Sequence, residues 1–443
     1  MIQILGTIAA FLIAVGILVF VHEFGHFLMA KLVGVRVEVF SFGYGKRVFG
    51  FRRGTTDYRV SILPMGGYVK LKGEGLFETG RAIDPDDLAA KSRWQRFLIM
   101  VMGSVMNLLL AVAIVAVLNG IGVSVPIYSE QVPVIGWLDP GSPAEKSGLQ
   151  VDDEILRIGG RAVKTWGDVE LAVGTKPDRL LPVVVRRGGA ELEVDLQTES
   201  VTRYQMGYAG FKGKILTQVL MVPAGTPAEK AGIRAGDLIL AVDGKPIYYY
   251  QFIQLIQANP ERQLLFTVRR QGQTLELPVT PRRDGEVGKV GLYPIAESEV
   301  RRYGVLAAIG QSVRENARNA FLVVSFLKDL FSGQASARQL SGPIEIASLS
   351  YSFLQLGWLP MMSWIAMISL QLGMINLFPI PFFDGGQIFV LAVEGLRRRD
   401  LSPRARQVWL QVGFVMFVAL LVFVILNDIV KWLPNGWASL VPF

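Results

Sequence analysis

The chain has 443 residues, of which 51% are hydrophobic, with no cysteine and a formal net charge of +8. This length predicts several domains, and the mean hydropathy of +0.39 favours a membrane protein over a soluble one. The absence of cysteine excludes disulfides and thiolate ligands, so any metal must be held by nitrogen and oxygen. Basic residues gather beside the apolar segments, which indicates membrane topology and argues against a nucleic-acid partner.

The first predicted element is a transmembrane helix over residues 1–32. It lacks a positive n-region and a cleavage site, so we interpret it as a retained span rather than a signal peptide. Near its end lies His22-Glu23-Phe24-Gly25-His26, an H-E-x-x-H pattern. Histidines four apart share one face of a helix, so both imidazoles can bind one ion while Glu23 stands beside them. Zinc peptidases use this arrangement, in which the carboxylate accepts a proton from water.

His22 and His26 are the only histidines in the chain. Random placement would put two histidines four residues apart in roughly one chain in two hundred. The alternative interpretation is a pair of buried helix histidines without a metal. Polar and ionisable side chains inside an apolar segment are costly unless they have a function, so the pattern favours a metal site.

Residues 33–96 form a polar, basic loop. Alternating residues predict strands over 37–45 and 58–63 with a turn at 53–57, and Gly66-Gly67-Tyr68-Val69-Lys70 predicts a short edge strand. Two interpretations stay open. The segment is either an ordinary cytosolic hairpin, or a hairpin folded back toward the site, where an extended peptide can pair with it.

A second span is predicted over 97–119, and it contains Asn107. A single Asn in a span is more often a helix–helix contact than a catalytic group. The soluble region that follows contains an internal repeat, because the pattern of residues 141–156 recurs at 225–240. The two copies, over 121–200 and 205–285, resemble tandem PDZ domains of the bacterial type, which bind extended peptides by strand addition. Peptide binding and steric shielding are both open as their role.

The remaining elements run to the C-terminus. Residues 300–350 are amphipathic and predict an interfacial helix. The third span region, 356–386, ends in Asn376-Leu377-Phe378-Pro379-Ile380-Pro381-Phe382-Phe383-Asp384-Gly385-Gly386. Its two prolines remove amide donors, so we expect Asp384 on unwound backbone just past the apolar run. A basic loop over 387–407 and a fourth span over 408–431 follow.

Topology indicates which of these parts can meet. Short loops rich in Lys and Arg stay in the cytosol, so loops 33–96 and 387–407 are expected there, with both termini and the repeated domains outside. The histidine pair and Asp384 then lie at the same cytosolic depth. Catalytic zinc takes three protein ligands and a water, and no third histidine exists, so the third ligand must be a carboxylate. Asp384 is the best candidate, Glu394 is a weaker rival, and an ordinary turn role for Asp384 is the alternative.

The motifs H-E-F-G-H and N-L-F-P-I-P-F-F-D-G, with two PDZ repeats between the second and third spans, resemble the site-2 intramembrane metalloproteases. The resemblance extends along most of the chain, including Gly66-Gly67-Tyr68-Val69-Lys70 and Leu340-Ser341-Gly342-Pro343-Ile344. It implies zinc held by His22, His26 and Asp384, with Glu23 as general base. It also implies that Asn376 helps to hold the substrate or the reaction intermediate.

The resemblance further implies a membrane-reentrant β-hairpin that clamps the substrate backbone. The residues implied in this clamp are Gly43, Tyr44, Gly45, Gly67 and Tyr68. One departure from the family pattern is visible in the second span, where the family commonly has Gly-Pro ahead of an Asn. Here Gly103-Ser104 precedes Asn107, so a role for a proline kink does not carry over.

The expected fold class is a polytopic α-helical membrane protein with four transmembrane helices, a membrane-reentrant β-hairpin and two tandem β-rich PDZ domains. The expected function is zinc-dependent hydrolysis, in the bacterial inner membrane, of transmembrane segments of single-span proteins after a prior extracytoplasmic cut. The implied substrates are anti-sigma-factor type regulators and signal-peptide remnants. The lipid bilayer is the expected surrounding partner, and peptides are the expected ligands of the PDZ domains. The alternative function is a non-catalytic, zinc-binding membrane scaffold. A transporter is disfavoured because the four spans show no inverted repeat.

Overall fold

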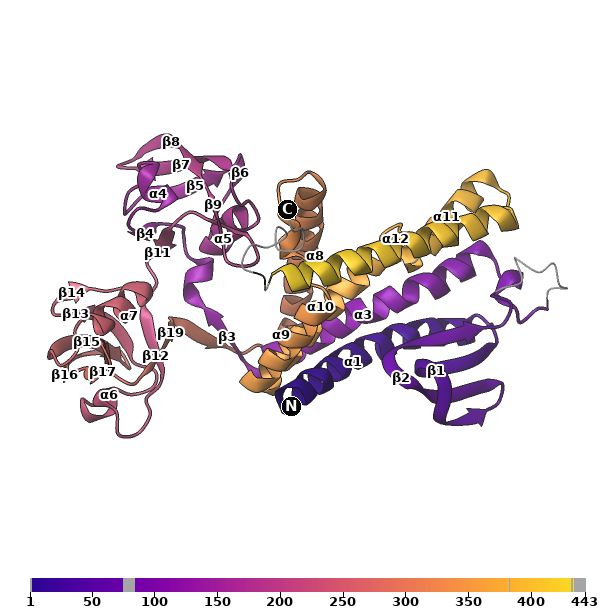
Figure 1. Cartoon of the computed structure of the whole chain (residues 1–443), viewed down its shortest axis with the longest axis horizontal. Coiled ribbons are helices and arrows are strands. Elements are labelled where there is room, and N and C mark those ends of the chain that lie inside the picture. The colour runs from indigo at the N-terminus through magenta and orange to yellow at the C-terminus, as the bar shows by residue number, and fades with distance from the viewer. Residues whose placement is uncertain (1, 75–83, 382, 432, 434–443) are drawn as a thin grey trace. The chain divides into compact units, whose positions relative to one another are not determined.

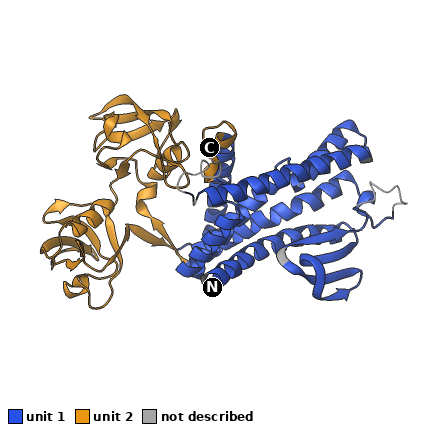
Figure 2. Cartoon of the chain, in the orientation of Figure 1, with its two compact units in different colours: residues 1–121, 302–328, 340–443 blue, residues 122–301, 329–339 orange. Residues whose placement is uncertain are grey.

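The computed structural model describes the chain except for residues 1, 75–83, 382, 432 and 434–443, so Phe382 of the third-span motif lies outside the described residues. The chain divides into two compact units, which Figure 2 distinguishes by colour. Unit 1 comprises residues 1–121, 302–328 and 340–443, and unit 2 comprises residues 122–301 and 329–339. Within the described residues, four helices are long and apolar enough to cross a membrane: Ile4–Leu32, Arg93–Ile121, Trp358–Asn376 and Arg404–Val430.

Unit 1 is built mainly from helices. These are α1 (Ile2–Leu32), η1 (Leu88–Ala90), α3 (Arg93–Ile121), α8 (Val305–Phe331), α9 (Pro343–Leu356), α10 (Trp358–Asn376), α11 (Asp384–Arg397) and α12 (Pro403–Val430). The helix α3 packs against α1, α10 and α11 (Figure 1). Glycines permit the close approach, since a Cβ atom on Gly25 would lie 2.4 Å from the Met102 carbonyl oxygen. Small residues at helix contacts are what lets apolar helices associate in lipid.

The hairpin of unit 1 is more folded than a simple pair of strands. Its strands β1 (Val37–Arg53) and β2 (Thr56–Leu71) each bend back, so Phe40 pairs with both Tyr58 and Val69, while Phe51 pairs with Tyr58. Positive φ angles of 90° at Gly43 and 93° at Gly45 permit the bend in β1. The segment 67–71 pairs with 37–42 on one side and, among the described residues, has no strand partner on the other, so it forms an edge of the sheet.

Three expectations for the C-terminal part need correction. The predicted basic loop over 387–407 begins with α11, because the residues after Gly386 are apolar helix formers that bury Val390. Asp384 is the first residue of that helix, and the described residues 377–381 and 383 before it are not helical. The amphipathic region contains two helices, because α8 ends at Phe331, shortly before Gly333 with its φ of 68°, and the shorter α9 begins at Pro343 after Gly342.

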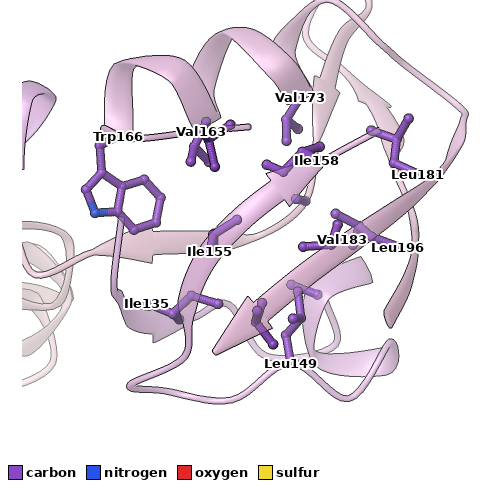
Figure 3. Packing of buried hydrophobic residues seen from close by; sticks show 14 residues of the cluster. Ile135, Leu149, Ile155, Ile158, Val163, Trp166, Val173, Leu181, Val183 and Leu196 are labelled. Atoms are coloured by element: carbon purple, nitrogen blue, oxygen red, sulfur yellow. The ribbon is translucent and has the colours of Figure 1, made fainter. Parts of the chain in front are cut away.

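The first half of unit 2 is a β-rich module with its own core. Its elements are β3 (Val123–Pro126), η2 (Ile127–Glu130), β4 (Ile135–Leu138), α4 (Pro143–Lys146), β5 (Glu154–Ile158), β6 (Arg161–Ala162), α5 (Trp166–Gly174), β7 (Leu180–Arg187), β8 (Ala190–Gln197), β9 (Glu199–Val201), β10 (Met206–Tyr208) and β11 (Phe211–Gly213). A sheet of order β6-β5-β7-β8 packs under α5, and side chains such as Ile155, Val183 and Leu196 fill the core (Figure 3).

The second half of unit 2 is a similar module. Its elements are β12 (Thr217–Met221), α6 (Pro227–Lys230), β13 (Leu238–Val242), β14 (Lys245–Pro246), α7 (Tyr249–Gln257), β15 (Leu264–Arg270), β16 (Gln273–Val279), β17 (Arg282–Asp284), β18 (Val287–Lys289) and β19 (Tyr293–Ala296), followed by β20 (Ser298–Arg301), which pairs with β3, and later by η3 (Ala337–Gln339). The main sheet has the order β16-β15-β13-β12-β19, with β14 beside β13. Phe252 and Phe266 lie in its core.

The sequence repeat is also a repeat of buried interactions. In the first module the guanidinium of Arg187 donates to both carboxylate oxygens of Asp153, at 2.7 and 2.6 Å, and to the Gly148 carbonyl at 2.9 Å. In the second module Arg270 donates in the same way to Asp237 and to the Gly232 carbonyl. Both aspartates are fully buried, so each bidentate pair satisfies a carboxylate that would otherwise be costly to bury.

Candidate metal centre

Three side chains of unit 1 converge at one point. The Nε2 atom of His22 lies 3.2 Å from Oδ2 of Asp384, and Nε2 of His26 lies 3.4 Å from the same oxygen. The two Nε2 atoms are 3.2 Å apart. The side chains are only 11%, 12% and 18% exposed, so the three atoms form a nearly equilateral, largely buried triangle.

The dimensions of this triangle fit zinc. Ligand atoms at about 2.0–2.2 Å in tetrahedral geometry are about 3.3 Å from one another. The Asp384 Oδ2 atom is buried and has no hydrogen-bond partner among the described residues. A buried carboxylate oxygen without a partner is costly, and a cation between the three atoms removes that cost. Three nitrogen and oxygen ligands leave a fourth position free, which is the arrangement of catalytic rather than structural zinc.

The side chain of the catalytic candidate Glu23 lies beside the edge segment of β2. A Cβ atom on Gly67 would lie 3.5 Å from Cγ of Glu23 and 2.8 Å from the Ser41 carbonyl oxygen. Glu23 also interacts with the backbone of Val69. The edge segment of β2 therefore passes directly beside the carboxylate, and only glycine fits at position 67.

Asp384 is presented by a tight turn at the start of α11. Cβ atoms on Gly385 and Gly386 would lie 2.2 Å from the carbonyl oxygens of Phe378 and Ile380. No real Cβ atom approaches backbone so closely, so the two glycines allow residues 377–381 to fold against the first turn of the helix. The packing of α11 on α3 then brings Asp384 to the histidine pair.

The rival carboxylate Glu394 has a different role. It is fully buried, and its Oε1 atom accepts hydrogen bonds from Arg406 Nη2 at 2.5 Å and from the Leu401 amide at 2.8 Å. These partners hold the turn between α11 and α12. The structure therefore separates the two candidates by their partners, because Asp384 is the one that meets the imidazoles.

The residues expected to bind substrate are only partly gathered at the centre. Besides Gly67, Tyr44 lies at the start of the edge segment, because a Cβ atom on Gly66 would lie 2.5 Å from its ring. Tyr68 stacks on Tyr44 with ring centroids 5.8 Å apart, and its hydroxyl accepts a hydrogen bond from Arg59. The roles of Gly43 and Gly45 visible in the structure are conformational.

Asn376 is the last residue of α10 and is half-buried. Its side chain forms no hydrogen bond with the described residues, so its amide group is available to a ligand. Asn376 lies close to Asp384 along the chain, because the non-helical stretch that leads to Asp384 starts directly after Asn376.

Two residues of α3 lie closer to the centre than predicted from the sequence, which favours only a helix–helix contact for Asn107 and indicates no role for Gly103. A Cβ atom on Gly103 would lie 2.4 Å from Nε2 of His26 and 2.8 Å from Cε1 of His22, so any side chain there would occupy the site. Asn107 is fully buried, with its Nδ2 atom 3.5 Å from Nδ1 of His22. The signal in the sequence is the family pattern of a Gly ahead of an Asn in the second span, which Gly103 and Asn107 retain. Asn107 is also a helix–helix contact, since its carbonyl oxygen accepts a hydrogen bond from Ser369 of α10 at 2.8 Å.

A second group of potential metal ligands lies among the described residues of unit 1, at Asp84, Asp86 and Asp87. The ammonium group of Lys72 lies 2.8, 2.5 and 3.6 Å from these carboxylates. Hydrogen bonds to Asp84 and Asp86 raise the pKa of Lys72, so this lysine already supplies the cation.

Two imidazoles and a carboxylate around one point, with a glutamate beside them and apolar helices as the scaffold, define the class of membrane-embedded zinc metallopeptidases. Residues 10–420 match Peptidase family M50, and the chain belongs to this family. It is accordingly a zinc-dependent metalloprotease.

Proteins similar to the whole chain carry names in agreement with that family. The regulator of sigma-E protease RseP of Salmonella typhimurium is 32% identical, with 97% of this chain and 99% of that protein covered. Protease RseP of Yersinia pestis is 31% identical over 97% of this chain and 99% of its own length. A Neisseria meningitidis protein whose name describes it as a zinc metalloprotease is 30% identical, with 96% and 99% covered.

Proposed function

We propose that the protein cleaves peptide bonds inside the transmembrane segments of single-span membrane proteins. The observation that carries this proposal is the position of the His22, His26 and Asp384 triangle. Both histidines lie in α1, a helix apolar enough to span a bilayer, and Asp384 follows α10, a second such helix. A hydrolytic centre with these supports acts on a bond at membrane depth.

The two histidines and Asp384 would hold zinc, which would lower the pKa of water to about 7 and polarise a carbonyl. Glu23 accepts a proton from the water while the water oxygen attacks the carbonyl carbon, and it then passes the proton to the leaving amine nitrogen. The amide of Asn376 donates a hydrogen bond to the substrate carbonyl oxygen as negative charge develops on it. The free state of that amide in the described structure supports this role.

The substrate must be extended before its backbone can be attacked. In a transmembrane helix every N–H and C=O group is bonded internally, so unwinding leaves polar groups without partners at a depth that lacks water. The edge segment 67–71 of β2 offers such partners beside Glu23. We therefore assign the hairpin, with Gly43, Tyr44, Gly45, Gly67 and Tyr68, as a membrane-reentrant clamp that adds the substrate as a further strand.

The two modules of unit 2 are assigned as PDZ domains that face the extracytoplasmic side. The first contains a cavity of about 440 Å³ beside α5, lined by side chains that include Trp166, Val169, Tyr208 and Phe211, and its size suits an extended peptide. A pair of folded modules outside the membrane also acts as a size filter. A substrate with a bulky external domain is kept away until a prior cut removes that domain.

The protein is proposed to lie in a bacterial inner membrane. The basic residues between the spans support a cytosolic position for loops 33–96 and 387–407, and with them a metal centre near the cytosolic face of a bacterial inner membrane. Both termini then lie outside. The name of the Salmonella relative refers to regulation of sigma-E, and substrates of the anti-sigma-factor type fit the single-span class proposed here.

The test is cleavage of a single-span reporter by the wild type and by Glu23→Gln, with zinc measured in each purified protein. The variant should bind zinc as the wild type does and cleave slower by a factor of about 10²–10⁴, because only proton transfer is removed. The control is Asp400→Asn, an exposed carboxylate that pairs with Arg93 outside the centre and the hairpin. Zinc binding without any reporter cleavage by the wild type would instead support the non-catalytic scaffold, and unchanged cleavage by Glu23→Gln would show that Glu23 is not the general base.

A further inference from the structure

The outer ring nitrogens of the two histidines both face α3. A neutral imidazole carries one proton, so a histidine that offers Nε2 to a metal must carry its proton on Nδ1. For His26 the partner of that proton is clear, since Nδ1 lies 2.8 Å from the Ile99 carbonyl oxygen. A carbonyl only accepts, so this contact fixes the tautomer that leaves Nε2 of His26 free.

The equivalent neighbour of His22 is the carboxamide of Asn107. Its Nδ2 atom is placed 3.5 Å from Nδ1 of His22, while its Oδ1 atom is buried without a partner among the described residues. The oxygen and nitrogen of a carboxamide have nearly the same shape, so their assignment follows from the hydrogen bonds they make. Nδ2 facing a protonated Nδ1 sets two donors against each other, whereas the reversed amide sets an acceptor against a donor.

We propose that Asn107 is a positioning residue that sets the tautomer of His22. Its Oδ1 atom accepts the Nδ1–H hydrogen bond, which leaves Nε2 of His22 unprotonated and directed at Nε2 of His26 and Oδ2 of Asp384. The two outer partners then come from one helix, with Asn107 serving His22 and Ile99 serving His26. This inference rests on the proposed role of the two histidines as metal ligands.

The surroundings of Asn107 hold it in place for this role. The residue is fully buried, and its own carbonyl oxygen accepts a hydrogen bond from Ser369 at 2.8 Å, which ties α3 to α10. Gly103, one turn earlier, leaves no side chain between α3 and the imidazoles. The carboxamide thus has little freedom to turn away, and a partner fixed in this way typically contributes a factor of about 10–100 in metal affinity.

The chain itself offers a direct test, because His22 and His26 are its only histidines. Labelling histidine with ¹⁵N gives ring signals from two residues, and their ¹⁵N shifts report which nitrogen carries the proton. In the zinc-free, full-length protein at a pH where both rings are neutral, we expect the Nδ1–H tautomer for both. A wild-type His22 protonated on Nε2 would overturn the proposal without any variant.

Variants separate positioning from packing. Asn107→Leu removes the acceptor at similar volume, so the His22 signals should move toward the Nε2–H tautomer while those of His26 stay unchanged. Asn107→Asp keeps an acceptor oxygen and should preserve the wild-type tautomer of His22. The matched control is Asn119→Leu, a buried amide in the same helix that bonds to Glu315 away from the centre.

Zinc affinity supplies the second measurement. We expect Asn107→Leu to bind zinc about 10–100-fold more weakly than the wild type, and Asn107→Asp and Asn119→Leu to bind it within a few-fold of the wild type. An unchanged His22 tautomer in Asn107→Leu, or equal losses in Asn107→Leu and Asn119→Leu, would contradict the proposal. If added zinc does not shift the histidine signals of the wild type, the assignment of the two histidines as metal ligands fails. That result is distinct from the tautomer measurement, which tests only the role of Asn107.

Discussion

Oδ2 of Asp384 lies 3.2 Å from Nε2 of His22, although most of the sequence separates the two residues. The contact depends on α3, which packs against both α1 and α11 and has only a glycine where the imidazoles lie. The distances between the three ligand atoms therefore depend on the packing of α1, α3 and α11 as much as on the ligand residues themselves. Variants in each of these parts have separate, measurable consequences.

Asp384→Asn is expected to lose zinc and, with it, proteolysis. A neutral amide cannot balance the ion as a carboxylate does, so the metal content of the purified protein should fall well below one ion per chain. The measurement is elemental analysis after purification without added metal. Asp400→Asn is the control, because Asp400 is exposed and pairs with Arg93 outside the centre. Stoichiometric zinc in Asp384→Asn would show that another residue completes the ligand set.

Gly103→Ala is expected to disrupt the metal centre by steric means alone. The added Cβ atom would lie 2.4 Å from Nε2 of His26, so the imidazole must move and zinc affinity should drop at least tenfold. In the same helix, a Cβ atom on Gly120 meets nothing within 4 Å. Gly120→Ala should therefore bind zinc normally and be equally or more stable, by up to about 1 kcal/mol. Equal zinc affinity in both variants would rule out the close approach of α3.

The clamp proposal predicts a dependence on the substrate helix. Replacing helix-destabilising residues near the cleaved bond by Leu should slow cleavage, because the bond must be unwound before it can pair with the edge segment 67–71. The measurement is the initial cleavage rate of reporters that differ only in this region. The same replacements near the opposite end of the reporter span provide the control. Rates that ignore the position of the replacements would argue against unwinding at the β-edge.

The size-filter proposal predicts that deletion of residues 127–283, most of the two modules, permits cleavage of full-length substrate. The deleted residues lie within unit 2. A substrate whose external domain has already been removed should be cut at similar rates by the wild type and the deletion variant, which tests that the centre is intact. The comparison is made with membranes that contain equal amounts of each protein. Continued resistance of full-length substrate would place the filter in another part of the molecule.

Several features could be predicted because they depend on residues close together in the sequence. The H-E-x-x-H spacing places His22 and His26 on one helical face whatever the rest of the chain does, and apolar length alone identifies candidate spans. The repeat is likewise visible in the sequence, because each copy carries the same short pattern of residues. Its structural counterpart is the buried pair of Arg187 with Asp153 and that of Arg270 with Asp237. Asp384 was named as the third ligand from its expected depth, and the structure brings it to the imidazoles.

Other features required the tertiary structure, because they depend on partners distant in the sequence. The expected depth favours Asp384 over Glu394, but only the packing of α11 and α12 shows that Glu394 instead accepts a hydrogen bond from Arg406. Helix packing likewise places Asn107 against His22, a position that spacing within α3 does not reveal. The sequence by itself determined the chemistry of the donors, since that is a property of residue types and short spacings. The tertiary structure decided which donors meet, because close contact between α1, α3 and α11 is set by glycines and packing surfaces in separate segments.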